Sequence, residues 1–131
     1  MAGYLFTNST LVLEQAMRFQ WTKQNAINDN IINAETPNYK AKYVTFEEAL
    51  DSSVRLALRN TDRRASSVRS AIMRSRPVVH VAESESMRMD DNGVNVTEQE
   101  TEATRNALQM QYTMDAISRE LTGLRSLIKG Q

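Results

Sequence analysis

Residues that could carry out catalysis or hold a metal are few and scattered in this sequence of 131 residues. His80 is the only histidine and there is no cysteine, which excludes thiol nucleophiles, disulfides and thiolate metal sites. No carboxylate cluster at metal-ligand spacing accompanies His80, so a metal site or a catalytic base would have to be built from distant residues. No nucleophile elbow, phosphate-binding glycine loop or pair of catalytic acids appears among the many serines and aspartates. The sequence therefore predicts a protein that is not an enzyme and needs no cofactor or metal.

Charge is divided into two opposite zones, although the formal net charge is zero. Residues 55–76 contain seven arginines and one aspartate, a net charge of +6, and residues 83–102 contain seven acidic residues and one arginine, a net charge of −6. The basic zone is a solvated face, a phosphate-binding surface, or a patch that meets the acidic zone of another copy. Phosphate binding is the weakest reading, because no aromatic residues interleave with the arginines. We expect no nucleic-acid partner, and we predict that opposite zones of two copies meet.

The elements that must position any surface are helical, because glycine and proline are scarce and apolar residues recur at helical spacing. The N-terminal helix should end at Pro37, and it carries apolar and amide residues in alternating steps of four and three. Such a heptad seam faces a partner helix along its length. Trp21 lies beside the seam and either caps the helix pair or contacts a neighbouring subunit. The seam consists of Leu13, Met17, Gln20, Gln24, Ile27, Ile31 and Ala34.

The clearest periodicity is at the C-terminus, where a capping box at residues 97–100 predicts the start of a long helix. Lys129 and Gly130 should close this helix. Because each terminal helix carries a heptad seam, the two should pair in the manner of a coiled coil, with the methionines as core residues. The C-terminal seam consists of Ala103, Ala107, Met110, Met114, Ile117, Leu121, Leu124 and Ile128.

The central segment is predicted to be variable and partly disordered. A second capping box at residues 45–48 should start a short helix, whose apolar stripe weakens after Leu58. We expect residues 60–76 to be mobile in the free monomer, because so little apolar surface does not offset the entropy of ordering. Residues 77–82 predict one extended strand or an ordered loop, too short to form a sheet, and Asp91-Asn92-Gly93 predicts a turn.

These patterns predict an all-α fold made of one domain. The N-terminal helix and its exit occupy residues 1–40, the central segment occupies residues 41–92, and the C-terminal helix occupies residues 93–131. The first 20 residues show no basic segment and no apolar run long enough for a secretory signal. No run approaches the roughly 18 apolar residues of a membrane span, so we expect no direct membrane span.

The stretch from Asn30 to Lys40 resembles the signature that closes the first helix of flagellar rod, hook and axial proteins, Asn-Ile-Ala-Asn-x-x-Thr-Pro-Gly-Tyr-Lys. The likeness covers roughly residues 10–50 and 91–131 and leaves the centre unmatched. Ile32 stands where alanine is usual, and Asn38 replaces glycine, which is tolerated because asparagine also visits left-handed conformations. The residues assigned to the motif are Asn30, Asn33, Ala34, Thr36, Pro37, Tyr39 and Lys40.

This resemblance implies a structural subunit of the bacterial flagellar basal body. Such a subunit is exported unfolded by the flagellar type III apparatus without a cleaved signal, and it polymerises in the periplasm into a hollow rod that transmits torque. Its partners would be other copies, other rod proteins, the basal-body adaptor, and proteins of the membrane ring and export gate. The residues alone leave an alternative, a small helical adaptor or export chaperone that binds a partner helix between its seams.

Overall fold

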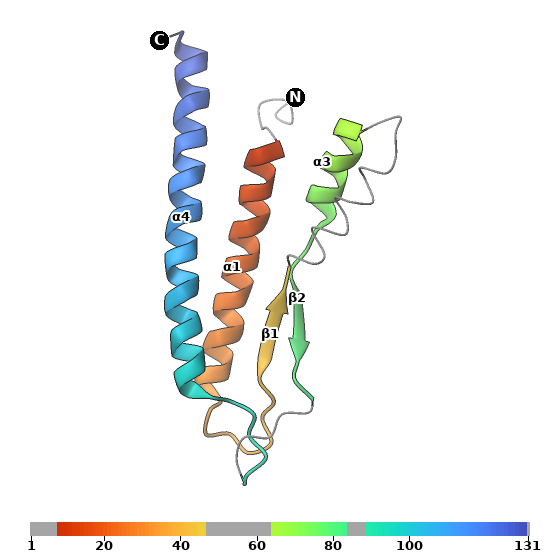
Figure 1. The fold of residues 1–131 in the computed structure, drawn as a ribbon, viewed down its shortest axis with the longest axis vertical. Helices are drawn as coiled ribbons and strands as arrows, with labels where there is room; N and C mark the ends of the chain where they lie inside the picture. The colour runs from red at the N-terminus through yellow and green to blue at the C-terminus, as the bar shows by residue number, and fades with distance from the viewer. Residues whose placement is uncertain (1–7, 47–63, 84–88, 131) are drawn as a thin grey trace.

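The computed structural model describes residues 8–46, 64–83 and 89–130. Two long helices, α1 (Asn8–Ile32) and α4 (Val96–Lys129), run antiparallel side by side (Figure 1). A two-stranded sheet and a short helix, α3 (Arg64–Arg74), lie on the opposite flank of α1 (Figure 1). α1 is the central element and packs against α4, the sheet and α3. The predicted helical fold with long, paired terminal helices is confirmed, with a small sheet added to it.

The start of α4 differs from the predicted capping box. Asn95 is the N-cap, in an extended conformation with φ −96° and ψ 104°, and its side-chain oxygen accepts a hydrogen bond from the backbone N–H of Glu98. Asparagine caps helices at least as well as threonine, and Glu98 then falls in the first turn, where a negative charge suits the helix dipole. At the other end, Gly130 adopts φ 67° and donates its backbone N–H to Ser126, which confirms the predicted glycine cap.

The exit from α1 is fastened to the loop that leads into α4. Asn38 adopts φ 60°, as expected for an asparagine at the glycine position of the motif, and its N–H donates to the carbonyl of Asp90 at 3.0 Å. The N–H of Gly93 donates to the carbonyl of Tyr39, also at 3.0 Å. Asp91 adopts φ 65°, a positive φ of the kind expected in this stretch, but the turn itself lies just before it, at residues 89–90. These bonds place the two ends of the central segment side by side.

The expectation that residues 77–82 were too short to form a sheet is wrong. β2 (Val78–Val81) pairs antiparallel with β1 (Lys42–Thr45), and Tyr43 lies opposite His80 in this register. Their rings stack with centroids 5.1 Å apart. The pairing was missed because two four-residue strands about 35 positions apart carry no local signal of each other. Thr45 itself ends β1, and the helix expected to follow it lies outside the described residues.

Helix α3 forms inside the segment that we expected to be too poor in apolar residues to order. Ile72, from its thin apolar stripe, is buried, and the helix packs on α1. After α3, Ser75 donates its hydroxyl to the carbonyl of Ala71 at 2.8 Å and is buried as well. Packing against α1 thus supplies the stabilisation that the local sequence lacks. Mobility in the free monomer stays a prediction.

Candidate assembly surface

Polar side chains form the centre of the contact between α1 and α4. The amide of Asn106 donates to the backbone carbonyl of Gln20 at 2.9 Å and to the side-chain oxygen of Gln24 at 3.0 Å. Gln20 donates to the hydroxyl of Thr113 at 2.9 Å. These bonds fix the antiparallel register of the two helices, because each polar group has one partner position that satisfies it.

Further polar contacts continue this line along both helices. Asn30 donates to Gln99 at 2.9 Å near the start of α4. Thr10 donates to the carboxylate of Glu120 at 3.0 Å near the start of α1. On α4 the polar positions therefore recur every seven residues, at Gln99, Asn106, Thr113 and Glu120.

Two buried acceptors in this line have no hydrogen-bond partner among the described residues, Oε1 of Gln20 and Oδ1 of Asn106. A buried unsatisfied acceptor costs about 1–3 kcal/mol. The contact between α1 and α4 is therefore specific in register but weaker than an apolar seam of the same length would be.

The predicted seam of α4 divides into two rows. Ala103, Met110, Ile117 and Leu124 are half-buried. Ala107, Met114, Leu121 and Ile128 lie exposed beside them, and we name these four residues the α4 stripe. Members of the α4 stripe are seven residues apart, and a helix drifts only about 20° per heptad, so they form one line. In contrast, every predicted seam residue of α1 is buried or half-buried.

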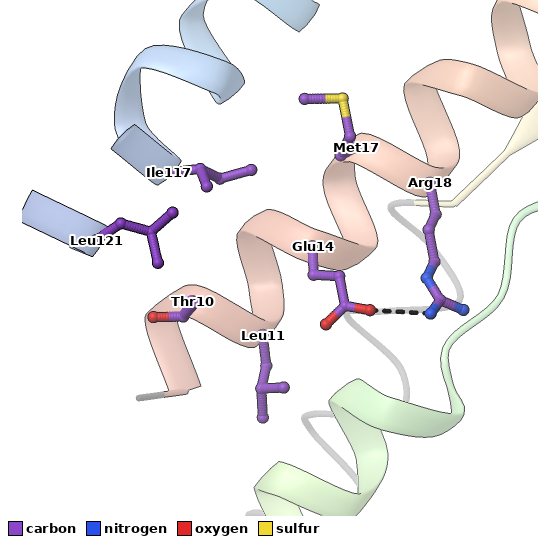
Figure 2. Close-up of a pocket in the computed structure, with 7 residues that line it drawn as sticks. All are labelled: Thr10, Leu11, Glu14, Met17, Arg18, Ile117 and Leu121. Carbon is purple, nitrogen blue, oxygen red and sulfur yellow. Dashed lines mark hydrogen bonds and ion pairs between the residues drawn. The ribbon is translucent and has the colours of Figure 1, made fainter. Parts of the chain in front are cut away.

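An apolar groove runs between α1 and the α4 stripe (Figure 2). It has a volume of about 350 Å³. Leu11 and Met17 form its α1 side, and Ile117 and Leu121 form its α4 side. Thr10, Glu14 and Arg18 complete its lining, with a 2.9 Å ion pair between Glu14 and Arg18 at the rim (Figure 2). Leu121 belongs to both the groove and the α4 stripe, so the two form one continuous apolar surface.

Helix α4 is longer than the helix that it pairs with, at 34 residues against 25. Because Thr10 lies opposite Glu120, the last turns of α4 extend past the first residue of α1, as Figure 1 shows. Leu127 and Ile128 in these turns are 80% and 75% exposed. Isolated helical ends with exposed apolar residues are marginally stable in water, so this end of α4 is suited to a further partner.

The motif residues build the exit of α1 rather than the apolar surface. Asn30 is fully buried; its side chain donates to the carbonyl of Lys42 and accepts from the Lys42 N–H, both at 2.8 Å. Ala34 is buried, and Asn33 donates to the carbonyl of Asp29. Thr36 and Pro37 form the exposed turn, while half-buried Tyr39 and Lys40 contact Asn30 and Asp91 respectively.

Two buried asparagines were not singled out from the sequence as structural residues. Asn92 is fully buried and donates to the carbonyls of Asn33 and Thr36 at 3.1 and 2.7 Å. Asn106 lies at the centre of the helix pair. The burial of Asn106 could have been predicted from the sequence, because this asparagine lies among apolar residues at heptad spacing. For Asn92, the only signal in the sequence is its place in a stretch of turn-forming residues.

Three ion pairs among the described residues connect segments distant in sequence, and the longest of them, at 3.6 Å, joins Lys40 and Asp91. Lys23 on α1 and Glu102 on α4 are 2.8 Å apart, and this hydrogen bond lowers the pKa of Glu102 below its ordinary value of 4.5, although burial opposes the shift. The hydrogen bond from Lys42 to Asp29, at 2.9 Å, raises the pKa of Lys42. Burial raises the pKa of Tyr39. These shifts have structural causes, and none occurs beside the apolar groove.

Within the described ranges, no three histidine, aspartate or glutamate side chains come together in a group that could hold a metal ion. In the same ranges, no helix combines the length and apolar character needed to cross a membrane. The apolar groove and the α4 stripe are the surfaces that need a functional explanation.

In the part of the chain that the structure describes, two long terminal helices are paired and leave an apolar face exposed, so the protein is of the class of helical proteins with paired terminal helices. Comparison with known proteins gives the family. The chain is 32% identical over 127 residues to the flagellar basal body rod protein FlgB of Bacillus subtilis, covering 96% of this chain and 97% of the relative. It is 30% identical over 127 residues to FlgB of Cereibacter sphaeroides, covering 96% of this chain and 98% of that relative. It is 23% identical over 121 residues to FlgB of Aeromonas hydrophila, covering 90% of each chain. No family model matches the chain. The chain belongs to the family of FlgB flagellar basal body rod proteins.

Proposed function

We propose that the chain is a structural subunit of the proximal rod of the flagellar basal body. Subunits polymerise through their terminal helices into a hollow shaft that transmits torque. The subunit is exported by the flagellar type III apparatus without a cleaved signal and acts in the periplasm. Its partners are other copies, other rod proteins, the basal-body adaptor, and proteins of the membrane ring and export gate.

The observation that supports polymerisation best is the continuous apolar surface made by the groove and the α4 stripe. A helix binds such a groove through apolar residues spaced three, four and seven positions apart. The end of α4 has apolar residues at that spacing, Leu121, Leu124 and Ile128, and α1 of the same chain does not cover this end completely. The end of α4 of one copy can therefore bind the groove of another. Membership of the FlgB family favours self-assembly over the alternative function, an adaptor that binds the helix of a different protein in the same groove.

Replacement Leu121→Asp tests the proposal. Leu121 is 48% exposed in the single chain, so a carboxylate there remains hydrated before assembly and leaves the fold of the monomer intact. In a polymer the same carboxylate would be buried without a partner, at a cost of about 3 kcal/mol or more. We expect a folded monomer, by circular dichroism, that fails to support motility in cells lacking the native protein.

A matched control is Leu108→Asp, which changes an equally exposed leucine of α4 (53%) outside the groove and the α4 stripe. We expect this variant to support motility. Normal motility with Leu121→Asp would overturn the role of the apolar surface in assembly.

A further inference from the structure

A second depression lies on the side of α1 that faces α3. It has a volume of about 330 Å³. One of its lining side chains is Trp21, the only tryptophan of the sequence, which is 61% exposed. The residues that line it are Gln15, Arg18, Trp21 and Thr22 from α1, and Arg76 and Pro77 from the turn after α3. Trp21 therefore does not cap the pair of α1 and α4.

The chemistry of this depression fits a carboxylate-bearing partner. Tryptophan and arginine are the residues most enriched at the energetic centres of protein interfaces. A guanidinium binds carboxylates through two parallel hydrogen bonds. Arg18 already pairs with Glu14, whereas Arg76 is exposed and has no ion pair with any residue that the structure describes. Arg76 is thus the cation available to a ligand.

Acidic residues of suitable exposure lie at the opposite end of the same chain. Glu98 is exposed in the first turn of α4, Glu100 is exposed just after that turn, and Asp90 is exposed in the loop before the helix. They cannot reach the depression of their own molecule. The hydrogen bond between Asn30 and Gln99 places this turn beside the end of α1, and Trp21 is nine residues, about 14 Å, further along on a different face.

We propose that the depression around Trp21 binds the first turn of α4 of a second copy, with Arg76 paired to Glu98. This inference rests on the proposed self-assembly and adds a lateral contact beside the apolar groove, with which the depression shares only Arg18. The two contacting surfaces differ, so the contact is head-to-tail and leaves a free surface of each kind on the outer copies. Such a contact propagates rather than closing into a dimer, as a polymer requires.

Trp21 is its own probe, because no other tryptophan contributes to the fluorescence. On raising the concentration of the purified chain, we expect its emission to shift to shorter wavelength and its quenching by iodide to fall, in step with the mass measured by sedimentation. High salt should reverse both changes, since the contact depends on a charge pair. Association without a change at Trp21 would overturn this contact alone, whereas no association at any concentration would overturn self-assembly as well.

Charge reversal identifies the partner group. Arg76→Glu should weaken the association monitored at Trp21 about tenfold, because it replaces an attraction with a repulsion. Arg74→Glu is the matched control, since Arg74 is exposed two residues away but does not line the depression, and it should retain the native association. Combining Arg76→Glu with Glu98→Arg should restore most of the loss. Equal effects of the two single reversals, or no restoration in the combined variant, would overturn the assignment.

Discussion

Buried asparagines determine how distant segments of this chain meet. Asn30, Asn92 and Asn106 are each fully buried, and each bonds to a segment far from it in sequence or to a backbone turn. An amide side chain both donates and accepts, so one asparagine satisfies several backbone groups that would otherwise be left without partners. The buried amide side chains of these asparagines therefore determine which segments of the chain pair with each other. Most helical hairpins have larger apolar residues at such buried positions.

Replacement Asn92→Ala tests this role where it is simplest. It removes the bonds to the carbonyls of Asn33 and Thr36 and the bond that Asn92 accepts from the N–H of Val94. We expect a loss of about 2–3 kcal/mol in the free energy of unfolding, measured with urea. Asn25→Ala, at an exposed position of α1, should change it by less than about 0.5 kcal/mol. Equal stabilities of the two variants would contradict the role of Asn92.

The ion pair between Lys23 and Glu102 makes the helix pair sensitive to acid. Because the pKa of Glu102 is lower in the folded state than in the unfolded state, ionised Glu102 stabilises the fold at neutral pH. That contribution is lost as the pH falls through the folded-state pKa. On lowering the pH from about 7 to about 3, the free energy of unfolding, measured with urea, should fall less for Glu102→Gln than for the native chain. The difference between the two decreases should be about 0.5–1 kcal/mol. Glu100→Gln, at an exposed position, should follow the native curve.

At the scale of elements, the polar contacts between α1 and α4 fix the register of the two helices but stabilise the pair less than apolar contacts would. Replacing both Gln24 and Asn106 with leucine removes both side-chain partners of one polar contact, together with the unsatisfied buried acceptor of Asn106, and adds apolar contact. Replacing both partners of a polar contact is often neutral or stabilising. We expect the double variant to unfold at a higher temperature than the native chain. Asn106→Ala alone should unfold at a lower temperature, because it leaves Gln24 without its partner on α4 and creates a cavity. A lower midpoint for the double variant would show that the polar line stabilises the pair.

The sequence predicted the helices well and their contact only in part. Heptad spacing located α1 and α4 and their partnership, because periodicity is a local property that a single helix displays. It did not distinguish the half-buried row Met110 and Ile117 from the exposed row Met114 and Leu121, because both rows are equally apolar. Only the position of α1, fixed by polar partners such as Gln20, separates them. The β1–β2 pairing was unpredictable for a related reason, since it depends on segments that meet only after folding.

For the whole molecule, the excess length of α4 connects folding with assembly. Its last turns, with Leu127 and Ile128 exposed, extend past the first described residue of α1, and helical ends that expose apolar residues are marginally stable in water. A second copy that covers these turns would stabilise them by mass action. We expect circular dichroism of the purified chain to show a gain of helix on going from dilute to concentrated samples, together with a gain in sedimentation. Leu121→Asp should retain the dilute spectrum and lose the gain. A compact molecule of constant helicity and size at every concentration would instead indicate a subunit that completes its fold before assembly, as expected of an adaptor.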